Sequence, residues 1–336
     1  MAFIEVNNVS KEFQVYKRQK GFLNSVKSLF HRQYEIKRAV CDIDFHIDKG
    51  ELVGYIGPNG AGKSTTIKML SGILLPTKGN IFVDGRIPYI NRKENAIHIG
   101  IVFGQRSQLY WDLPVEETFD LFKKMYRIND AQFKYNVEFY VDLLDMYEFL
   151  QKPVRQLSLG QKMRANLAVA LLHDPEILYL DEPTIGLDVV VKSRIRHFIR
   201  EVNKEKKITV MLTTHDMNDI EQICNRIIMI DKGYVLYDGS LIDFKDKYSG
   251  GYMLKVVFAN EGEKILDQRL KILKEEGFEK IILFNKEDIS VAETITQITR
   301  NYNITDLSIK EPEIEEVVRK IYESKNYDQQ ESRILI

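Results

Sequence analysis

A glycine-rich run has the residue types and spacing of a loop that binds phosphate. Its members are Gly57, Pro58, Asn59, Gly60, Ala61, Gly62, Lys63 and Ser64, followed by Thr65. Glycines let backbone N–H groups turn inward towards phosphate oxygens, and a helix that begins here adds its positive end. Lys63 can neutralise charge on the β- and γ-phosphates, and the hydroxyl of Ser64 can ligate Mg²⁺. The run therefore predicts a site for a nucleotide with Mg²⁺.

Two neighbouring acids follow an apolar run at Ile177–Leu180. Such a run suits a buried parallel strand, so Asp181 and Glu182 are expected at its carboxyl end. Asp181 would hold Mg²⁺ through water, and Glu182 would orient and polarise an attacking water as general base. An acidic pair alone can be a solvated strand end. Together with the phosphate loop, it favours a hydrolytic site.

The sequence Leu157-Ser158-Leu159-Gly160-Gln161 resembles the LSGGQ signature motif that defines the ABC ATPases, with Leu159 in place of the first glycine. In that family two subunits pair head to tail, and the signature of one completes the nucleotide site of the other. The resemblance implies that Ser158, Gly160 and Gln161 reach the γ-phosphate of an ATP bound by a partner subunit. ATP and Mg²⁺ are the cofactors that it implies.

Three further positions resemble family motifs in chain order. Gln105 is similar to the Q-loop glutamine, which senses Mg²⁺ and the attacking water, although Gly104 is inserted before it. Asp188 resembles the D-loop aspartate that couples the two sites across the dimer. His215 resembles the switch histidine that contacts the γ-phosphate, and it follows an apolar strand, the edge where ligands bind in such sheets. The resemblance thus implies catalytic roles for Glu182, His215 and Gln105, and Mg²⁺ ligation by Ser64, Gln105 and Asp181.

Phe13 matches the aromatic residue that stacks on adenine in the family. Two alternatives stay open at this point: Phe13 packs in the core, or Tyr16 does the stacking.

The order of apolar runs predicts the fold class. Strand and helix patterns alternate over 1–245, which indicates an α/β domain with a mostly parallel sheet, a preceding antiparallel β part and a helical subdomain at about 105–172 that contains the signature. A small C-terminal α+β domain is expected at 250–324, before a loose tail at 325–336. Its expected strands are 252–258, 280–284 and 304–309, and its expected helices are 263–276, 292–301 and 312–323.

Two segments bear on the kind of transporter. The ending Glu311–Val317 resembles that of ATPases driving ABC-2 type exporters, and a basic amphipathic insert at 17–38 resembles inserts in exporter ATPases. The insert could lie against the membrane or the permease, or could pack on the sheet domain. A polysaccharide or teichoic-acid type exporter and an importer are the alternative functions. Trp111 could anchor a permease or be buried in the core.

Composition limits the remaining classes. The formal net charge is -1, so bulk attraction to nucleic acid is not expected, and no long coiled coil of the DNA-repair type interrupts 64–157. No stretch of roughly 18 apolar residues occurs, so a partner is expected to supply the membrane part if the protein works at a membrane. The expected partners are ABC-2 type permease subunits and a second copy of the chain or a paralogous ATPase subunit. The expected location is the cytoplasmic face of the membrane.

Overall fold

A computed structural model describes residues 2–16, 34–104, 106–248 and 251–310, together with 314–315, 317–319 and 321–322. The chain divides into two compact units, Met1–Gly239 and Ser240–Ile336. Gln105, residues 17–33 of the insert and most of the Glu311–Val317 ending lie outside the described residues.

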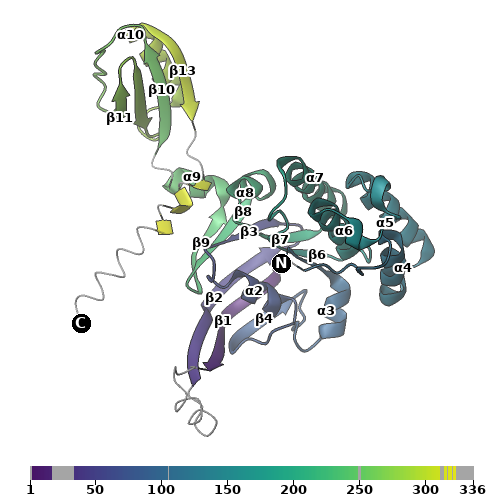
Figure 1. The fold of residues 1–336 in the computed structure, drawn as a ribbon. Coiled ribbons are helices and arrows are strands. Elements are labelled where there is room, and N and C mark those ends of the chain that lie inside the picture. Colours follow the sequence, from purple (N-terminus) through teal and green to yellow (C-terminus); the bar gives the residue numbers. More distant parts are fainter. Residues whose placement is uncertain are drawn as a thin grey trace, which may run out of the picture. The chain divides into compact units, whose positions relative to one another are not determined.

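A six-stranded sheet forms the centre of the first unit (Figure 1). Its β5–β6, β6–β7, β7–β3 and β3–β8 pairs are parallel. The central strands are almost entirely buried, as strands of parallel sheets between helices are. Because parallel strands end at one edge, the segments that follow them meet there. In spatial order the strands are β5 (Ile99–Phe103), β6 (Ile177–Asp181), β7 (Thr209–Thr213), β3 (Leu52–Ile56), β8 (Arg226–Asp231) and β9 (Tyr234–Ser240).

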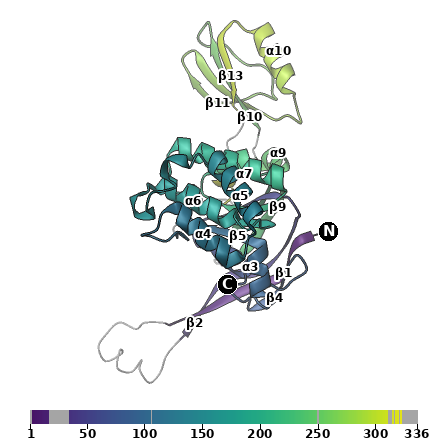
Figure 2. The same cartoon turned by 90° about the vertical axis from the view of Figure 1, so that its right-hand side faces the viewer.

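An antiparallel sheet of three strands, in the order β2–β1–β4, precedes and accompanies the parallel one (Figure 2). β1 (Ala2–Tyr16) pairs with β2 (Tyr34–Asp48) along its length, and β4 (Lys78–Val83) lies on its other side. Alternate residues of β2 are buried, and they join a core that includes Tyr55 of β3. The insert expected at 17–38 is therefore too long, because residues 34–38 belong to β2.

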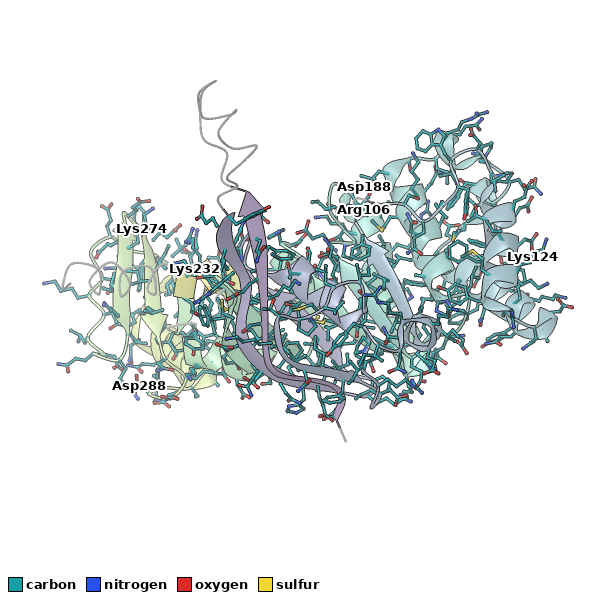
Figure 3. The ribbon with its side chains drawn as sticks, turned by 90° about the horizontal axis from the view of Figure 1, so that it is seen from below. Arg106, Lys124, Asp188, Lys232, Lys274 and Asp288 are labelled. Carbon is teal, nitrogen blue, oxygen red and sulfur yellow. The ribbon has the colours of Figure 1, made fainter. Side chains whose placement is uncertain are left out.

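Helices surround the parallel sheet. α6 packs against β5 and contacts α4 and α5, which together make up the expected helical subdomain (Figure 1). Lys124 lies on the outer side of α4 (Figure 3). Apolar and polar residues alternate at helical spacing over 131–148, but the helix there ends earlier, at Leu143, before two short 3₁₀ turns at Tyr147–Phe149 and Val154–Gln156. The helices are α2 (Lys63–Leu70), α3 (Arg92–His98), α4 (Val115–Tyr126), α5 (Asp130–Leu143), α6 (Leu159–Leu171), α7 (Val189–Lys206) and α8 (Met217–Ile223).

The second unit begins with α9 (Leu241–Tyr248) and contains an antiparallel sheet in the order β11–β12–β10–β13. α10 (Val291–Asn301) follows β12, and Ser290 caps its first turn. The strands are β10 (Tyr252–Phe258), β11 (Lys271–Glu276), β12 (Glu279–Phe284) and β13 (Ile304–Lys310). The described residues between 314 and 322 are helical.

One expectation for this unit is wrong. Residues 263–276 were expected to form a helix, but 271–276 form the edge strand β11 and 263–267 have no regular structure. Gly277, at φ 55°, turns the chain so that β11 pairs with β12 as a hairpin. Ile265 and Leu270 pack on the sheet core, so apolar residues at helical spacing are buried without a helix.

The expected mixed α/β architecture is confirmed. Among the described residues, no helix is both long and apolar enough to span a membrane.

His173, just after α6, is held in its neutral form by burial. Its ring stacks on Tyr126 with centroids 4.0 Å apart, and its Nε2 donates to the carbonyl of Ile99 at 3.1 Å. Burial lowers the pKa of His173 to about 4, although the hydrogen bond to Ile99 opposes this shift. The stability that it contributes is therefore complete above the unfolded pKa of about 6.5 and is lost as the pH falls towards 4.

We expect His173→Gln to flatten the pH dependence of stability. The parent should lose about 3 kcal/mol of unfolding free energy between pH 7 and pH 4 that the variant does not lose, since glutamine keeps an N–H donor and does not titrate. Denaturant unfolding followed by fluorescence measures this, because the single tryptophan, Trp111, reports on the first unit. His46→Gln, at an exposed position of β2, is the control. Parallel pH curves for parent and His173→Gln would contradict the assignment.

Candidate functional site

The glycine-rich loop joins β3 to α2, and its conformation requires glycine at two positions. Gly62, the residue before α2, has φ 116°, and a Cβ there would lie 2.5 Å from the carbonyl oxygen of Ala39. A Cβ on Gly57 would lie 2.3 Å from the carbonyl oxygen of Ile230. Backbone therefore packs against backbone on the inner side of the loop, which leaves the loop curled around the start of the helix.

Lys63 is the first residue of α2 and is only 6% exposed. Its Nζ donates to the carbonyls of Gly57 at 2.6 Å and Pro58 at 3.1 Å. Burial lowers the pKa of Lys63, while the nearby charges of Glu182 and Asp181 raise it. The ammonium thus lies inside the loop, where an anion would meet it beside the helix N-terminus.

Asp181, the last residue of β6, accepts hydrogen bonds from hydroxyl groups of two other segments. Its Oδ1 accepts from Ser64 Oγ at 3.2 Å and from Thr213 Oγ1 at 2.7 Å. Thr213 ends β7, and it pairs directly with Asp181 in the sheet. Hydroxyl and carboxylate oxygens are ligands that Mg²⁺ prefers, so Ser64 and Asp181 fit a magnesium site beside the phosphate loop.

Glu182 and His215 lie together just beyond these strands. Glu182 Oε1 is 2.8 Å from His215 Nε2. The backbone of Glu182 has φ 58°, an uncommon value for a residue other than glycine, and its N–H donates to the Thr213 carbonyl at 2.9 Å. This left-handed turn sends the Glu182 side chain towards the cavity next to the phosphate loop.

A cavity of about 630 Å³ extends from Phe13 over the phosphate loop to Glu182. The size is within the usual range for small-molecule sites. Phe13 is half-buried and lines the cavity, so it is not a core residue. It pairs across β1 and β2 with Lys37, which lines the same cavity. The side chain of Tyr16 lies outside the described part of the structure, so the alternative that names it stays untested.

The signature-like residues begin α6. Ser158 caps the helix in a capping box with Gln161: the Gln161 N–H donates to Ser158 Oγ at 3.2 Å, and the Ser158 N–H donates to Gln161 Oε1 at 2.9 Å. Gly160 is buried, and a Cβ there would lie 3.1 Å from Val191 of α7. In the described residues none of the three lines the cavity that contains Lys63. Within one copy of the chain, Ser158, Gly160 and Gln161 therefore do not share a cavity with the phosphate loop.

Asp188 caps α7 and accepts from the Val191 N–H at 2.9 Å. The segment before it lies beside the signature-like turn, because a Cβ on Gly186 would be 3.3 Å from Leu159. Four large apolar side chains are exposed over this region, and α7 begins among them: Leu159, Ile185, Val189 and Val190. Exposed apolar clusters of this kind mark contact surfaces.

Gly104 lies against the acidic pair. Its N–H donates to the Asp181 carbonyl at 2.7 Å, and a Cβ would lie 2.2 Å from the carbonyl oxygen of Glu182. Gln105 lies outside the described residues. Arg106 follows it and lines a cavity of about 480 Å³ with Asp181, Glu182 and His215. Gly104 and Arg106, the neighbours of Gln105 in sequence, both line this cavity with the acidic pair.

A third cavity, an apolar hollow of about 290 Å³, lies between the helical subdomain and the sheet. Aliphatic and aromatic side chains dominate its lining, which includes the exposed Ile73. Trp111 is 61% exposed, with Lys162 Nζ 4.7 Å from its ring centroid, so its burial in the core is excluded. The residues lining the hollow include Ile73, Ala96, Ile101, Phe103, Arg106, Phe122, Tyr126 and His173.

Comparison with known proteins gives consistent matches. A family model described as "ABC transporter" matches residues 40–185. The chain is 34% identical over 212 residues to the ABC transporter ATP-binding protein NatA of Bacillus subtilis, covering 63% of this chain and 86% of NatA. It is 32% identical over 297 residues to the linearmycin resistance ATP-binding protein LnrL of the same organism, covering 84% and 93%.

A solved dimeric ATP-binding cassette in a post-hydrolysis state, bound to ADP and Pi, is also similar. It is 27% identical, and it superposes with a TM-score of 0.59 over 71% of this chain and 98% of that one.

Sequence reasoning missed three residues that the structure adds to the site: Thr213, Lys37, and the buried Asp219, which accepts hydrogen bonds from the hydroxyls of Thr184 and Thr214. The only signal for Thr213 was its place at the end of an apolar run, next to Thr214 and His215. Lys37 was assigned to the insert, and nothing in the sequence marked Asp219.

Gly104→Ala should impair hydrolysis more than nucleotide binding. The added methyl would meet backbone, so the Glu182 turn must move; the three atoms nearest to that methyl belong to Asp181 and Glu182, and none belongs to the phosphate loop. We expect the hydrolysis rate to fall by roughly tenfold or more, since small misplacements of reacting groups are costly, while ATP affinity stays within about twofold. Steady-state phosphate release and equilibrium ATP binding measure the two effects.

Gly239→Ala is the matched control, because its nearest atom is the hydroxyl end of the Tyr237 side chain, which can move. A Gly104→Ala protein that hydrolyses ATP at the parent rate would show that this contact does not constrain Glu182.

Proposed function

Because the chain belongs to the family of ABC transporter ATP-binding proteins and is an ATPase of that family, we propose that it powers a separate ABC-2 type permease for export. As the ATP-binding subunit of an ABC transporter, it would convert ATP-driven closure of a dimer into movement of the permease. The observation that supports the ATP-driven part of this proposal is the constellation of Lys63, Ser64, Asp181, Glu182 and His215 at one edge of the parallel sheet.

The residues of one copy support ATP binding in stated roles. The loop from Gly57 to Thr65 would hold the phosphates, with Lys63 against the β- and γ-phosphates. Phe13 would stack on adenine, a role that its place on the cavity wall supports. Ser64, Gln105 and Asp181 would hold Mg²⁺, which supplies charge neutralisation on the phosphates.

Hydrolysis would use Glu182 as the base that orients and deprotonates water. His215 would hold the Glu182 carboxylate through its Nε2, 2.8 Å away, and would contact the γ-phosphate. Gln105 would sense the water from the other side. The left-handed backbone at Glu182 supports this role, because strained conformations are kept where the surrounding structure fixes them for function.

A second copy would complete the site. Ser158, Gly160 and Gln161 would reach the γ-phosphate held by a partner subunit, and Asp188 would couple the two sites. Two observations support this: these residues stand apart from the cavity of their own copy, and exposed Leu159, Val189 and Val190 surround them. The similar cassette was solved as a dimer. A paralogous ATPase subunit could take the place of the second copy.

The membrane partner would bind at the apolar hollow next to Arg106, with exposed Trp111 close by in sequence as a possible anchor. The likeness to NatA and LnrL supports an ABC-2 type exporter, as do the insert and the Glu311–Val317 ending. The location would then be the cytoplasmic face of the membrane, through the permease. We further propose that 1–245 is the ATPase domain and 250–324 an accessory domain; the boundary at 245 falls within α9.

Glu182→Gln should abolish steady-state hydrolysis while ATP still binds, so that ATP-bound dimers accumulate. Removing a general base costs at least about a hundredfold in rate. Phosphate release and size-exclusion chromatography with ATP measure the two outcomes. Glu138→Gln, an exposed carboxylate on α5, is the control. Turnover at the parent rate would mean that Glu182 is not the base.

Ala96→Arg should prevent binding of the permease and leave ATP hydrolysis by the isolated subunit unchanged. Ala96 lies on α3, is exposed and lines the hollow, so a long cation there would occupy the docking surface. The tagged chain is purified from membranes of the cells that make it, and an integral membrane protein of the ABC-2 permease class should accompany the parent and the control Ala131→Arg, an exposed α5 position. If Ala96→Arg retains that protein in full, the hollow is not the docking surface.

A further inference from the structure

Asp219, in the first turn of α8, is a fully buried carboxylate that contacts two catalytic segments at once. Its Oδ2 accepts from Thr184 Oγ1 at 2.5 Å and from Thr214 Oγ1 at 3.1 Å. Thr184 and Thr214 are each 2% exposed. A carboxylate only accepts hydrogen bonds, so both hydroxyls must point their protons at the same oxygen.

The two threonines belong to the segments that present Glu182 and His215. Thr184 lies two residues after Glu182, and Thr214 directly precedes His215. The two side chains that they accompany are themselves 2.8 Å apart. One buried oxygen therefore ties together the backbones on which the Glu182–His215 contact depends.

The charge of Asp219 is balanced from α7. Arg196, 7% exposed, donates from Nη1 to Asp219 Oδ1 at 3.0 Å. Lys192, one turn earlier on α7, pairs with Asp216 at 2.6 Å. A buried carboxylate is tolerated when it is paired and hydrogen-bonded in this way, and its directed bonds then fix geometry.

The backbone around Glu182 has a conformation that needs support from hydrogen bonds such as those to Asp219. Glu182 has φ 58°, a conformation that persists only where neighbouring groups determine it. Gly104 closes one side of this turn by steric contact. The Thr184 hydroxyl holds the chain on the other side.

We propose that Asp219 is a positioning residue for ATP hydrolysis, which holds the Glu182 and His215 segments in register through Thr184 and Thr214. The inference rests on the proposed roles of Glu182 and His215. Asp219 does not touch the substrate, so its substitution should change the rate of the chemical step and leave the affinity for ATP unchanged.

The test uses the full chain and substitutions that keep side-chain shape. Thr184→Val and Thr214→Val each remove one hydroxyl and leave the Asp219–Arg196 pair intact. We expect kcat to fall by roughly tenfold in each, with KM for ATP within about twofold of the parent, because only the placement of the reacting groups changes. Thr184→Ser, which keeps the hydroxyl, should restore kcat to within about twofold.

Asp219→Asn should lower kcat by roughly a hundredfold, since it weakens both bonds at once. It also leaves Arg196 without its counter-charge, which can prevent folding. If Asp219→Asn does not fold, the two threonine variants provide the test instead. Thr294→Val is the control for loss of a buried hydroxyl: Thr294 lies on α10, is fully buried, and its Oγ1 donates to the Ser290 carbonyl at 2.9 Å. Its kcat should match the parent.

Glu182→Gln is measured alongside to separate the two proposals. If it is inactive while folded Thr184→Val and Thr214→Val both keep the parent kcat, the positioning role is wrong and the proposed function stands. If Glu182→Gln keeps the parent rate, the proposed base is wrong and the role of Asp219 falls with it.

Discussion

The parallel pairing of β6 with β7 sets Asp181 directly opposite Thr213, and the Thr213 hydroxyl donates to the Asp181 carboxylate at 2.7 Å. The rest of the site depends on this alignment. With Asp181 fixed, Ser64 can reach the same oxygen from the phosphate loop, so the start of α2 is held against the end of β6. Glu182, which directly follows β6, and His215, two residues after the end of β7, then come together. A shift of one residue in this register would turn Asp181 to the other face of the sheet and separate these groups.

The sequence could place Asp181 and His215 because each follows an apolar run, where the carboxyl edge of a parallel sheet is expected. It could place Lys63 and Ser64 because they complete the glycine-rich motif. It could not supply their lateral partners. Asp219 looks like any acid in the first turn of a helix until α8 packs beside α7 and β7. Gly104 was visible as an extra residue before Gln105, but only the fold shows that its missing Cβ leaves room for the Glu182 carbonyl. Local spacing predicts the ends of strands, whereas contacts between segments depend on packing.

The errors at the two ends of the described chain have different physical causes. The start of β2, residues 34–38, is exposed on both faces, so its strand structure does not come from burial of one face. It is held as a strand by its pairing with the end of β1. In β11 all six residues are exposed, and apolar residues before and within it recur at a spacing that also suits a helix. α10 was predictable because Ser290 caps it and one face packs on the sheet. An edge strand is stabilised by its pairing with a neighbouring strand. The pattern of residues within one segment does not reveal which strand that neighbour is.

The capping box at Ser158 bears on whether one residue can serve both its own helix and a neighbouring subunit. Its hydroxyl oxygen accepts the Gln161 N–H, and its backbone N–H is taken by the Gln161 side chain. The hydroxyl proton is not used in either bond, and a hydroxyl can donate while it accepts. The cap therefore fixes the direction of the Ser158 side chain without consuming its donor. Gly160 has no side chain to block an approach and packs against Val191, which keeps the first turn of α6 seated on α7. Under the role proposed for Ser158 and Gly160, the start of α6 is already held in place, so the ordering cost of binding a phosphate held by a second subunit would be met within the single copy before the two subunits associate.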